Sequence, residues 1–285
     1  MGAPMAQHLL GAGHEVALWS NQAAKAKELA KQGQGTACAT PKQVAERADV
    51  IFYCVGDSAM SRSVALDPDG LLAGIRPGSI VADCSTIAPE VSREIGAAFA
   101  AGGAHFLDSP CTGSRPGAEQ ATLTFMIGGE LAAFEKAKPY FEAMGKTFYH
   151  CGASGQGLQA KLTQNLVLAS IMQAFAEGMV LAAKGGIAPK LMLEILNNSA
   201  AKSGLISYKA PFILARDFHT NFATKWMAKD IGLALETAKA MDVPLPLTAI
   251  TEQMLRVTIA KGMGDEDFCS LIRVVEEWAG VVVQE

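Results

Sequence analysis

The sequence lacks the features of a metal-binding, disulfide-rich or nucleic-acid-binding protein. Its six cysteines are scattered without a C-x-x-C pair and its histidines do not cluster, so we expect no metal site and free thiols in a reducing compartment. A net charge of −4 gives no electrostatic case for nucleic acid or anionic membranes. The apolar stretch Leu166–Phe175 is far shorter than the ~20 residues of a membrane span, and no basic leader precedes a cleavage site. We therefore expect a cytoplasmic protein with no nucleic-acid or membrane partner.

What is present indicates two globular domains. The chain has 285 residues, of which 50% are hydrophobic and 18% charged, and domains average ~150 residues. In the first half, short apolar runs alternate with amphipathic helical stretches. The predicted strands are Glu15–Trp19, Val50–Cys54, Ser79–Asp83 and His105–Asp108. Strands that alternate with helices predict an α/β fold, a doubly wound parallel sheet covered on both faces.

The pattern changes after residue 153. Leu158–Lys184 reads as one uninterrupted helix, which would be ~40 Å long. Further helices are predicted at Pro189–Asn197, Phe222–Met241, Pro246–Lys261 and Phe268–Val275. We therefore predict a Rossmann-type domain over residues 1–153 and an all-helical domain over residues 154–285. The long apolar helix has few charges around its circumference, which suggests burial against a partner subunit.

The beginning of the chain resembles the end of a dinucleotide-binding motif. Such a motif needs a strand, then G-x-G-x-x-G, then a helix whose N-terminus holds the pyrophosphate. Here Met1 and Gly2 lead directly into a helix. Gly2 would match the last glycine of the motif, and no strand precedes it in this sequence. We expect both residues to bind the cofactor. We also expect the natural gene product to start upstream, with a strand and Gly-x-Gly before Met1.

The turn after the strand ending at Trp19 bears on the choice of cofactor. An NAD site uses Asp or Glu here to accept from the ribose 2′-hydroxyl, and this chain has Ser20, Asn21 and, further on, Lys25. These groups suit a 2′-phosphate better, so NADP is favoured over NAD, although the usual arginine is absent. A plain turn with an Asn cap would explain the segment equally well.

Four motifs then occur in order at compatible spacing. They are Asp83-Cys-Ser-Thr-Ile-Ala-Pro89, Asp108-Ser-Pro-Cys-Thr-Gly-Ser114, Gly155-Gln-Gly-Leu-Gln-Ala-Lys-Leu-Thr-Gln-Asn165 and Lys229-Asp230. Together they resemble the β-hydroxyacid dehydrogenase family, which includes 3-hydroxyisobutyrate dehydrogenase and glyoxylate/succinic semialdehyde reductases. The resemblance implies hydride transfer between NAD(P)H and a small carboxylate that bears an aldehyde, keto or hydroxyl group. It also implies a homodimer or homotetramer.

Lys161 is the predicted general acid/base. Lys161 and Asn165 are four residues apart on the long helix, and side chains at that spacing share one helix face. Reduction of a carbonyl leaves an alkoxide that needs a proton and a nearby positive charge, both of which an ammonium supplies. The resemblance implies that Asn165 orients the substrate. An isolated lysine would otherwise be read as a solvated surface residue.

The resemblance implies roles for a further set of site residues. Thr112, Gly113 and Ser114 would hold the substrate carboxylate, because a glycine lets backbone N–H groups approach an anion closely. Arg115 could clamp that carboxylate, although a solvated loop arginine is the stronger interpretation. The other implied positions are Phe222 and Asp230 for the substrate, and Cys54, Val55, Thr86 and Lys229 for the cofactor.

Two departures leave the substrate open. Thr112 stands where the family has serine, and Gln164 precedes Asn165 where the family often has asparagine. Phe222 could equally be a core residue, and Asp83 is expected to brace its loop. Alternative functions are an imine reductase of the same architecture, a decarboxylating sugar-acid dehydrogenase, or a non-catalytic NADP-binding scaffold. Lys161 argues against the imine reductase, and the scarcity of cations near Arg115 argues against the sugar-acid enzyme.

Overall fold

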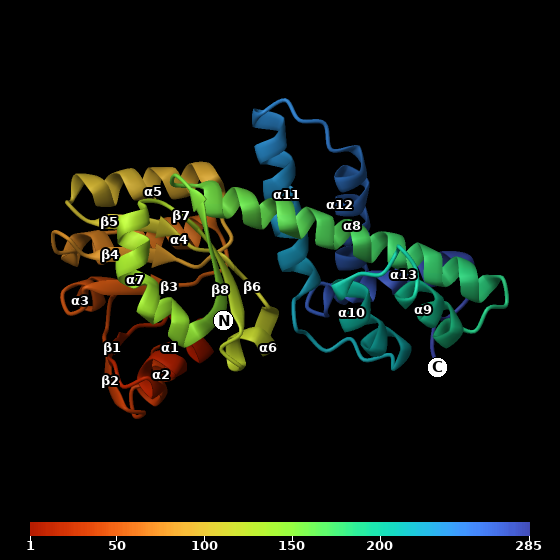
Figure 1. Ribbon diagram of the computed structural model, residues 1–285, viewed down its shortest axis with the longest axis horizontal. Coiled ribbons are helices and arrows are strands. Elements are labelled where there is room, and N and C mark those ends of the chain that lie inside the picture. The colour runs from red at the N-terminus through yellow and green to blue at the C-terminus, as the bar shows by residue number, and fades with distance from the viewer. The chain divides into compact units, whose positions relative to one another are not determined.

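The chain folds into two compact units. A computed structural model describes residues 1–285, and these divide into Met1–Lys161 and Leu162–Glu285 (Figure 1). The proposed boundary at residue 153 falls just before helix α8 (Gln156–Lys184). The first six residues of this helix belong to the first unit.

The first unit alternates strands and helices, as the sequence predicts. Its strands are β1 (Glu15–Leu18), β2 (Gln34–Ala37), β3 (Val50–Tyr53), β4 (Ile80–Asp83), β5 (His105–Asp108), β6 (Cys111–Thr112), β7 (Leu123–Gly128) and β8 (Gly145–Gly152). Its helices before α8 are α1 (Gly2–Gly11), α2 (Ala23–Leu29), α3 (Pro41–Ala45), α4 (Ser58–Leu66), η1 (Leu71–Gly74), α5 (Pro89–Ala101), α6 (Ser114–Glu119) and α7 (Leu131–Met144). The short strands β2 and β6 were not predicted, because they carry no apolar run.

The strands form two separate sheets. β3, β4 and β5 are parallel neighbours, which confirms the predicted parallel core. β7 then runs antiparallel to β5 and β6 and parallel to β8, so the sheet is mixed on that side. β1 and β2 form a parallel pair of their own.

Helices cover both faces of the larger sheet. Leu107 of β5 belongs to the same buried cluster as Phe134 and Phe141 of α7 and Met5 of α1. Phe106, the residue before Leu107, points to the opposite face. Its ring stacks on the ring of Phe99 of α5 at a centroid distance of 5.8 Å. This alternation is that of a strand buried on both sides, and it confirms the doubly wound α/β fold class.

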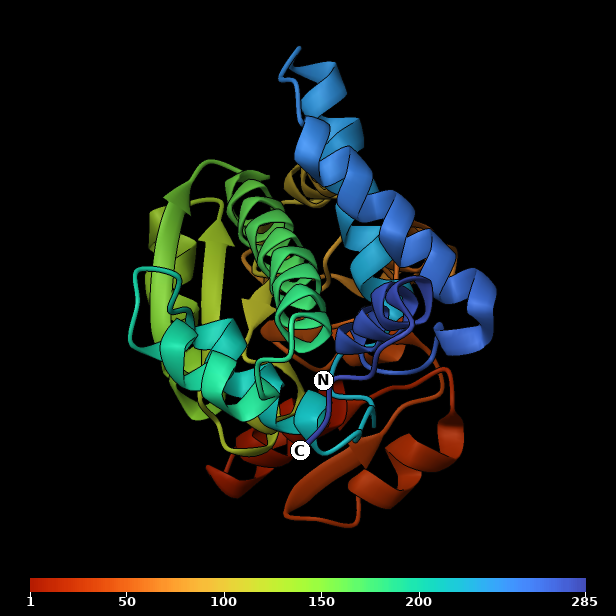
Figure 2. The same ribbon diagram turned by 90° about the vertical axis from the view of Figure 1, so that its right-hand side faces the viewer.

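The second unit is all-helical, as predicted. After α8 it contains α9 (Pro189–Asn197), α10 (Gly204–Leu214), α11 (Thr224–Ala240), α12 (Pro246–Thr258), η2 (Ile259–Met263), η3 (Phe268–Leu271) and α13 (Ile272–Ala279). α11 and α12 lie side by side (Figure 2). The sequence prediction missed α10, whose interior proline (Pro211) is a helix breaker by propensity.

α8 is the central helix of this second core. It has 29 residues, and its most apolar window has a mean hydropathy of 1.8 with 44% of residues buried. By length and composition alone this helix could therefore cross a membrane. The sequence analysis considered only the shorter apolar stretch Leu166–Phe175 and expected no membrane span. However, Met172, Phe175 and Met179 pack in one buried cluster with Ile213 of α10 and Ile231 of α11. The helix is thus the apolar core element of a globular unit.

The start of α8 is docked closely onto the end of the larger sheet. Gly155 has a φ of +88°, a left-handed conformation that glycine adopts without strain. A Cβ at Gly157 would lie 2.7 Å from the carbonyl oxygen of Asp108 and 2.8 Å from the amide nitrogen of Gly128. The Gly-x-Gly of this motif is therefore required by backbone packing.

We predict that Gly157→Ala destabilises the protein by about 1–3 kcal/mol or more, because backbone atoms cannot yield to the added methyl group. Gly178→Ala, in the same helix, is the matched control. A Cβ there meets no atom within 4 Å, so it should be neutral or stabilising by about 0.5–1 kcal/mol. Urea unfolding of the two variants measures the difference, and equal midpoints would contradict the predicted close docking.

Candidate active site

Two loops after neighbouring parallel strands are tied together by a buried aspartate. Asp83 ends β4, and its Oδ1 accepts the Ser85 N–H at 2.8 Å. The Ser85 Oγ in turn accepts the Val55 N–H from the loop after β3, also at 2.8 Å. The expectation that Asp83 braces its loop is confirmed. The predicted cofactor residues Cys54, Val55 and Thr86 therefore lie on two loops with a fixed mutual position.

The second carboxylate oxygen of Asp83 is held by a side chain of α4. Ser61 of α4 donates to Asp83 Oδ2 at 2.6 Å, and the Tyr53 hydroxyl lies 3.1 Å from Ser61 Oγ. Burial raises the pKa of Asp83 despite the hydrogen bonds from Ser61 and Ser85. Burial also raises the pKa of Tyr53 well above its usual value, so Tyr53 stays a neutral donor in this network.

The predicted phosphate-binding positions are open and free of carboxylates. α1 has no side-chain cap and no acidic residue in its first turn, and a Cβ on Gly2 would meet nothing within 4 Å. In the turn after β1, Ser20 Oγ accepts the Gln22 N–H at 3.1 Å, while Asn21 and Lys25 are exposed. An uncapped helix N-terminus with hydroxyl, amide and ammonium groups fits the phosphates of a dinucleotide.

The loop after β6 has a constrained backbone. Gly113 has a φ of +128° and Ser114 one of +54°, and the latter is uncommon for a residue with a side chain. A Cβ on Gly113 would also approach Leu123 to 3.2 Å. Thr112 is half-buried and pairs with Thr124 of β7. Arg115 is exposed and pairs with Glu119 at 2.7 Å, so its guanidinium is engaged within α6.

Asp108 caps the helix that carries Lys161. Its Oδ1 accepts the Gly155 N–H at 2.7 Å and its Oδ2 accepts the Leu158 N–H at 2.9 Å. These donors belong to the first turn of α8, whose N–H groups have no partner within the helix. Burial raises the pKa of Asp108 to about 6, against the opposing effect of both N–H donors.

Lys161 lies in the first unit near β6. The residue is 7% exposed. Burial raises the pKa of the Cys111 thiol, and the positive charge of Lys161 opposes that rise. The ammonium therefore lies within electrostatic range of the residue that precedes Thr112. Lys161 and the predicted carboxylate-binding loop belong to the same unit.

In the second unit, Asn165 and the Lys229–Asp230 pair form one polar cluster. Asn165 Nδ2 donates to Asp230 Oδ2 at 2.6 Å. Lys229 Nζ lies 3.0 Å from Asp230 Oδ1, and Asn165 and Asp230 are each 2% exposed. Asp230 thus fixes both the amide of Asn165 and the ammonium of Lys229. Phe222 is half-buried, with its ring edge-on to Phe268 at 6.1 Å.

Sequence reasoning missed the groups that hold these residues in place. The sequence analysis gives Asp108 no role of its own, and it does not predict the buried ion pair between Lys209 and Asp267. The aspartate that ends β5 at the same sheet edge as the Gly-x-Gly motif is a signal that could have suggested a helix cap. Nothing local in the sequence connects Lys209 with a residue 58 positions away.

Both halves of the chain match families of known proteins. Residues 1–152 match the family described as the NAD binding domain of 6-phosphogluconate dehydrogenase. Residues 155–275 match the family described as NAD-binding of NADP-dependent 3-hydroxyisobutyrate dehydrogenase. The chain belongs to the β-hydroxyacid dehydrogenase family. It is therefore an NAD(P)-dependent oxidoreductase, as the four motifs predicted.

Similar members of the β-hydroxyacid dehydrogenase family are alike over their whole length. The 2-(hydroxymethyl)glutarate dehydrogenase of Eubacterium barkeri is 36% identical over 99% of this chain and 94% of its own. The NAD-dependent L-serine dehydrogenase of Pseudomonas aeruginosa is 35% identical, over 98% and 96%. A solved structure of Mycobacterium tuberculosis 3-hydroxyisobutyrate dehydrogenase with L-serine has a TM-score of 0.89 and 31% identity, covering 96% of this chain and 95% of that one.

We predict a pH dependence of stability that is specific to Asp108. Its folded pKa of about 6 lies above its ordinary value of 3.8, so the folded state holds the proton more tightly than the unfolded state. The contribution of Asp108 is fully present below pH 4 and is lost as pH rises through 6, by about 3 kcal/mol.

Urea unfolding of the wild type and Asp108→Asn between pH 4 and 7.5 measures this effect. Because other carboxylates titrate in both proteins, the informative quantity is the difference in unfolding free energy. Wild type should lose stability relative to the variant as pH rises. A difference that is constant over this range would show that the Asp108 pKa is not raised.

Proposed function

We propose that this chain oxidises a β-hydroxy acid of the type HOCH2–CHR–COO⁻, or reduces the corresponding aldehyde, with Lys161 as general acid/base. Three similar proteins support this class, since their names share one chemical unit. 2-(Hydroxymethyl)glutarate, L-serine and 3-hydroxyisobutyrate each carry a primary hydroxyl one carbon away from the carbon that bears the carboxylate. They differ only in R. Glyoxylate and succinic semialdehyde, which are small carboxylates with an aldehyde, are the second substrate type.

The observation that supports the proposal is that Lys161 is buried and that its charge acts on Cys111, the residue before Thr112. A buried ammonium near Thr112–Ser114 combines a proton donor with a loop suited to a carboxylate. Thr112 offers a hydroxyl, and Gly113 and Ser114 offer backbone N–H groups on a loop with constrained φ angles. A substrate whose carboxylate binds this loop would have its hydroxyl or carbonyl oxygen close enough for Lys161 to reach.

Lys161 handles the proton of the reaction. In reduction, its Nζ donates a proton to the substrate oxygen as that oxygen gains negative charge. In oxidation, the neutral amine takes the hydroxyl proton. Asn165, whose amide is held by Asp230, orients the substrate. Bound NAD(P) supplies or accepts the hydride.

We further propose NADP as the preferred cofactor. Ser20, Asn21 and Lys25 would bind the 2′-phosphate, since no acidic residue lies between positions 19 and 27. The N-terminus of α1 at Met1–Gly2 would face a phosphate of the dinucleotide. The loops with Cys54, Val55 and Thr86 would line the nicotinamide half, and Lys229 is a further cofactor contact that the resemblance implies.

The test is a substrate panel assayed with both cofactors. Wild type is assayed with L-serine, 3-hydroxyisobutyrate and 2-(hydroxymethyl)glutarate in oxidation, and with glyoxylate, succinic semialdehyde and a cyclic imine in reduction. Lys161→Met should lower kcat about 10²–10⁴-fold on the preferred substrate. Its affinity for NADPH should change less than about threefold, because uniform binding is retained.

Lys136→Met is the control, since Lys136 is an exposed lysine on α7 of the same unit. It should leave kcat unchanged. A Lys161→Met variant that keeps most of its turnover would refute the assigned mechanism. Activity on the imine alone would favour an imine reductase, and a folded protein that binds neither cofactor would favour a scaffold.

We propose that the chain is a cytoplasmic homo-oligomer, a homodimer or homotetramer. The end of α8, the loop that follows it and helix α9 present four large apolar side chains to solvent. These are Leu181, Ile187, Leu191 and Ile195, which are 40–76% exposed. α9 buries none of its residues within the single chain. An apolar surface of this kind is typical of a subunit interface.

The double change Leu191→Lys/Ile195→Lys should dissociate the oligomer, because charged side chains replace apolar ones at the contact. Sedimentation equilibrium at micromolar concentration measures the mass. Leu131→Lys is the control, an equally exposed apolar residue (53%) on α7 of the first unit, and it should leave the mass unchanged. A monomeric wild type would disprove the proposal.

A further inference from the structure

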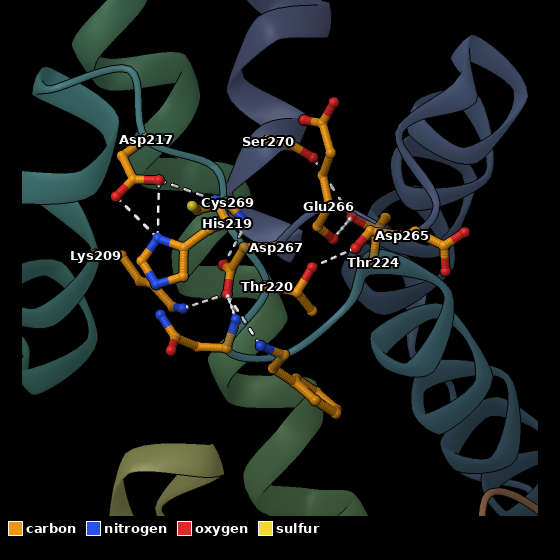
Figure 3. A network of polar contacts seen from close by, with 12 residues as sticks. Lys209, Asp217, His219, Thr220, Thr224, Asp265, Glu266, Asp267, Cys269 and Ser270 are labelled. Carbon is orange, nitrogen blue, oxygen red and sulfur yellow. Dashed lines mark hydrogen bonds and ion pairs between the residues drawn. The ribbon is translucent and has the colours of Figure 1, made fainter.

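A buried ion pair lies behind Phe222 in the second unit. Lys209 of α10 and Asp267, just before η3, are each 2% exposed at the side chain, and Nζ lies 2.7 Å from Oδ2. Figure 3 shows the two side chains meeting at the centre of a network that includes Asp217, His219, Thr224 and Glu266. The pair is not part of the residues assigned above to catalysis.

The Asp267 carboxylate accepts several backbone N–H groups, two of them from the loop that contains Phe222. Besides Lys209, its Oδ2 accepts the N–H groups of Asn221 at 3.1 Å and Phe222 at 3.0 Å. Its Oδ1 accepts the Cys269 N–H at 3.2 Å. The Phe222 carbonyl also accepts the Phe268 N–H at 3.0 Å. Both backbone polar groups of Phe222 are therefore fixed by one turn.

The same turn fixes the start of α11. The Thr224 N–H donates to the Glu266 carbonyl at 2.9 Å, and the Thr224 hydroxyl donates to the same oxygen at 3.1 Å. Both bonds go to the Glu266 carbonyl and not to the Asp267 side chain, so the start of α11, the helix that carries Lys229 and Asp230, has an attachment of its own. Phe222 lies two residues before this helix.

Stability does not account for the buried pair. Removing two charges from water costs several kcal/mol per ion, and apolar replacements of similar size are often as stable. The surroundings are already apolar, since the Lys209 ammonium lies 4.6 Å from the Tyr208 ring centroid and 5.2 Å from that of Phe268. What an apolar pair could not supply is an acceptor for the Asn221 and Phe222 N–H groups.

We propose that Asp267, oriented by Lys209, is a positioning residue that sets the place of the Phe222 ring and so the selectivity for the R group of the substrate. This inference rests on the proposed function and on the substrate contact that the family resemblance implies for Phe222. The ring is half-buried, packed against the buried cluster of the second unit and edge-on to Phe268, and the part that stays accessible would contact R. A displaced ring would alter binding of R without altering proton transfer.

Two double variants separate the acceptor from the charge. Lys209→Met/Asp267→Asn removes both charges and keeps a carbonyl oxygen for the backbone N–H groups. Lys209→Met/Asp267→Leu removes that oxygen as well. We expect the Leu variant to raise KM for the preferred β-hydroxy acid about tenfold with kcat within about threefold, and to compress its selectivity between L-serine and 3-hydroxyisobutyrate. The Asn variant should stay within about threefold of wild type in both respects.

Phe222→Ala completes the cycle. The triple variant Lys209→Met/Asp267→Leu/Phe222→Ala should have a KM within about twofold of that of Phe222→Ala alone, since both changes act through one ring. Lys261→Met removes a different ion pair of this unit, with Glu277, and should leave selectivity unchanged. Additive effects, or wild-type selectivity in the Leu variant, would overturn the proposal. If the Leu variant does not fold, Asp267→Glu decides, because it keeps the charge but displaces the oxygens, and unchanged selectivity there would also overturn it.

A second measurement does not depend on activity. Hydrogen exchange of residues 217–223 should accelerate at least about tenfold in the Leu variant and remain near wild type in the Asn variant. A wild type inactive on all the acids tested would refute the proposed function alone. Unchanged exchange in the Leu variant would refute the positioning role, whatever the substrate.

Discussion

The attachment of α8 to the edge of the larger sheet is the contact on which the rest of the site depends. Asp108 accepts two N–H groups from the first turn of the helix, and Gly157 allows the helix backbone to approach β7 without a side chain between them. A helix fixed at its start is fixed in rotation as well. The rotation of the helix sets the direction of the Lys161 side chain, and Asn165, four residues further on, lies on the same face.

The same principle recurs at each part of the site. A buried carboxylate accepts N–H groups from a loop that would otherwise be free to move. Asp83 does so for the loop after β4 and, through Ser85, for the loop after β3. Asp267 does so for the loop before α11. Acceptors with two oxygens are suited to this, because each can satisfy several backbone donors that are removed from water.

These carboxylates illustrate the balance between stability and function. Burial raises the pKa of both Asp83 and Asp108, so ionising either of them in the folded protein opposes folding. Their hydrogen bonds offset only part of that cost. Family members differ in the substrates they are named for, while the overall fold is retained at about one-third identity. Rigid anchoring of short loops allows such variation without loss of the scaffold.

The sequence by itself determined the fold class, the three strands of the parallel core and the family, because alternating apolar runs and ordered motifs are local signals. It also predicted that Lys161 and Asn165 lie on one helix, which the structure confirms, since the helical repeat places residues four apart on one face. It did not reveal α10, the short strands β2 and β6, or the anchors Asp108 and Lys209–Asp267. The anchors depend on contacts between residues 47 to 58 positions apart, and β2 and β6 depend on pairing with β1 and β7. Only the packed tertiary structure decides which buried carboxylate meets which N–H group, because burial, and not sequence neighbourhood, removes the competing water.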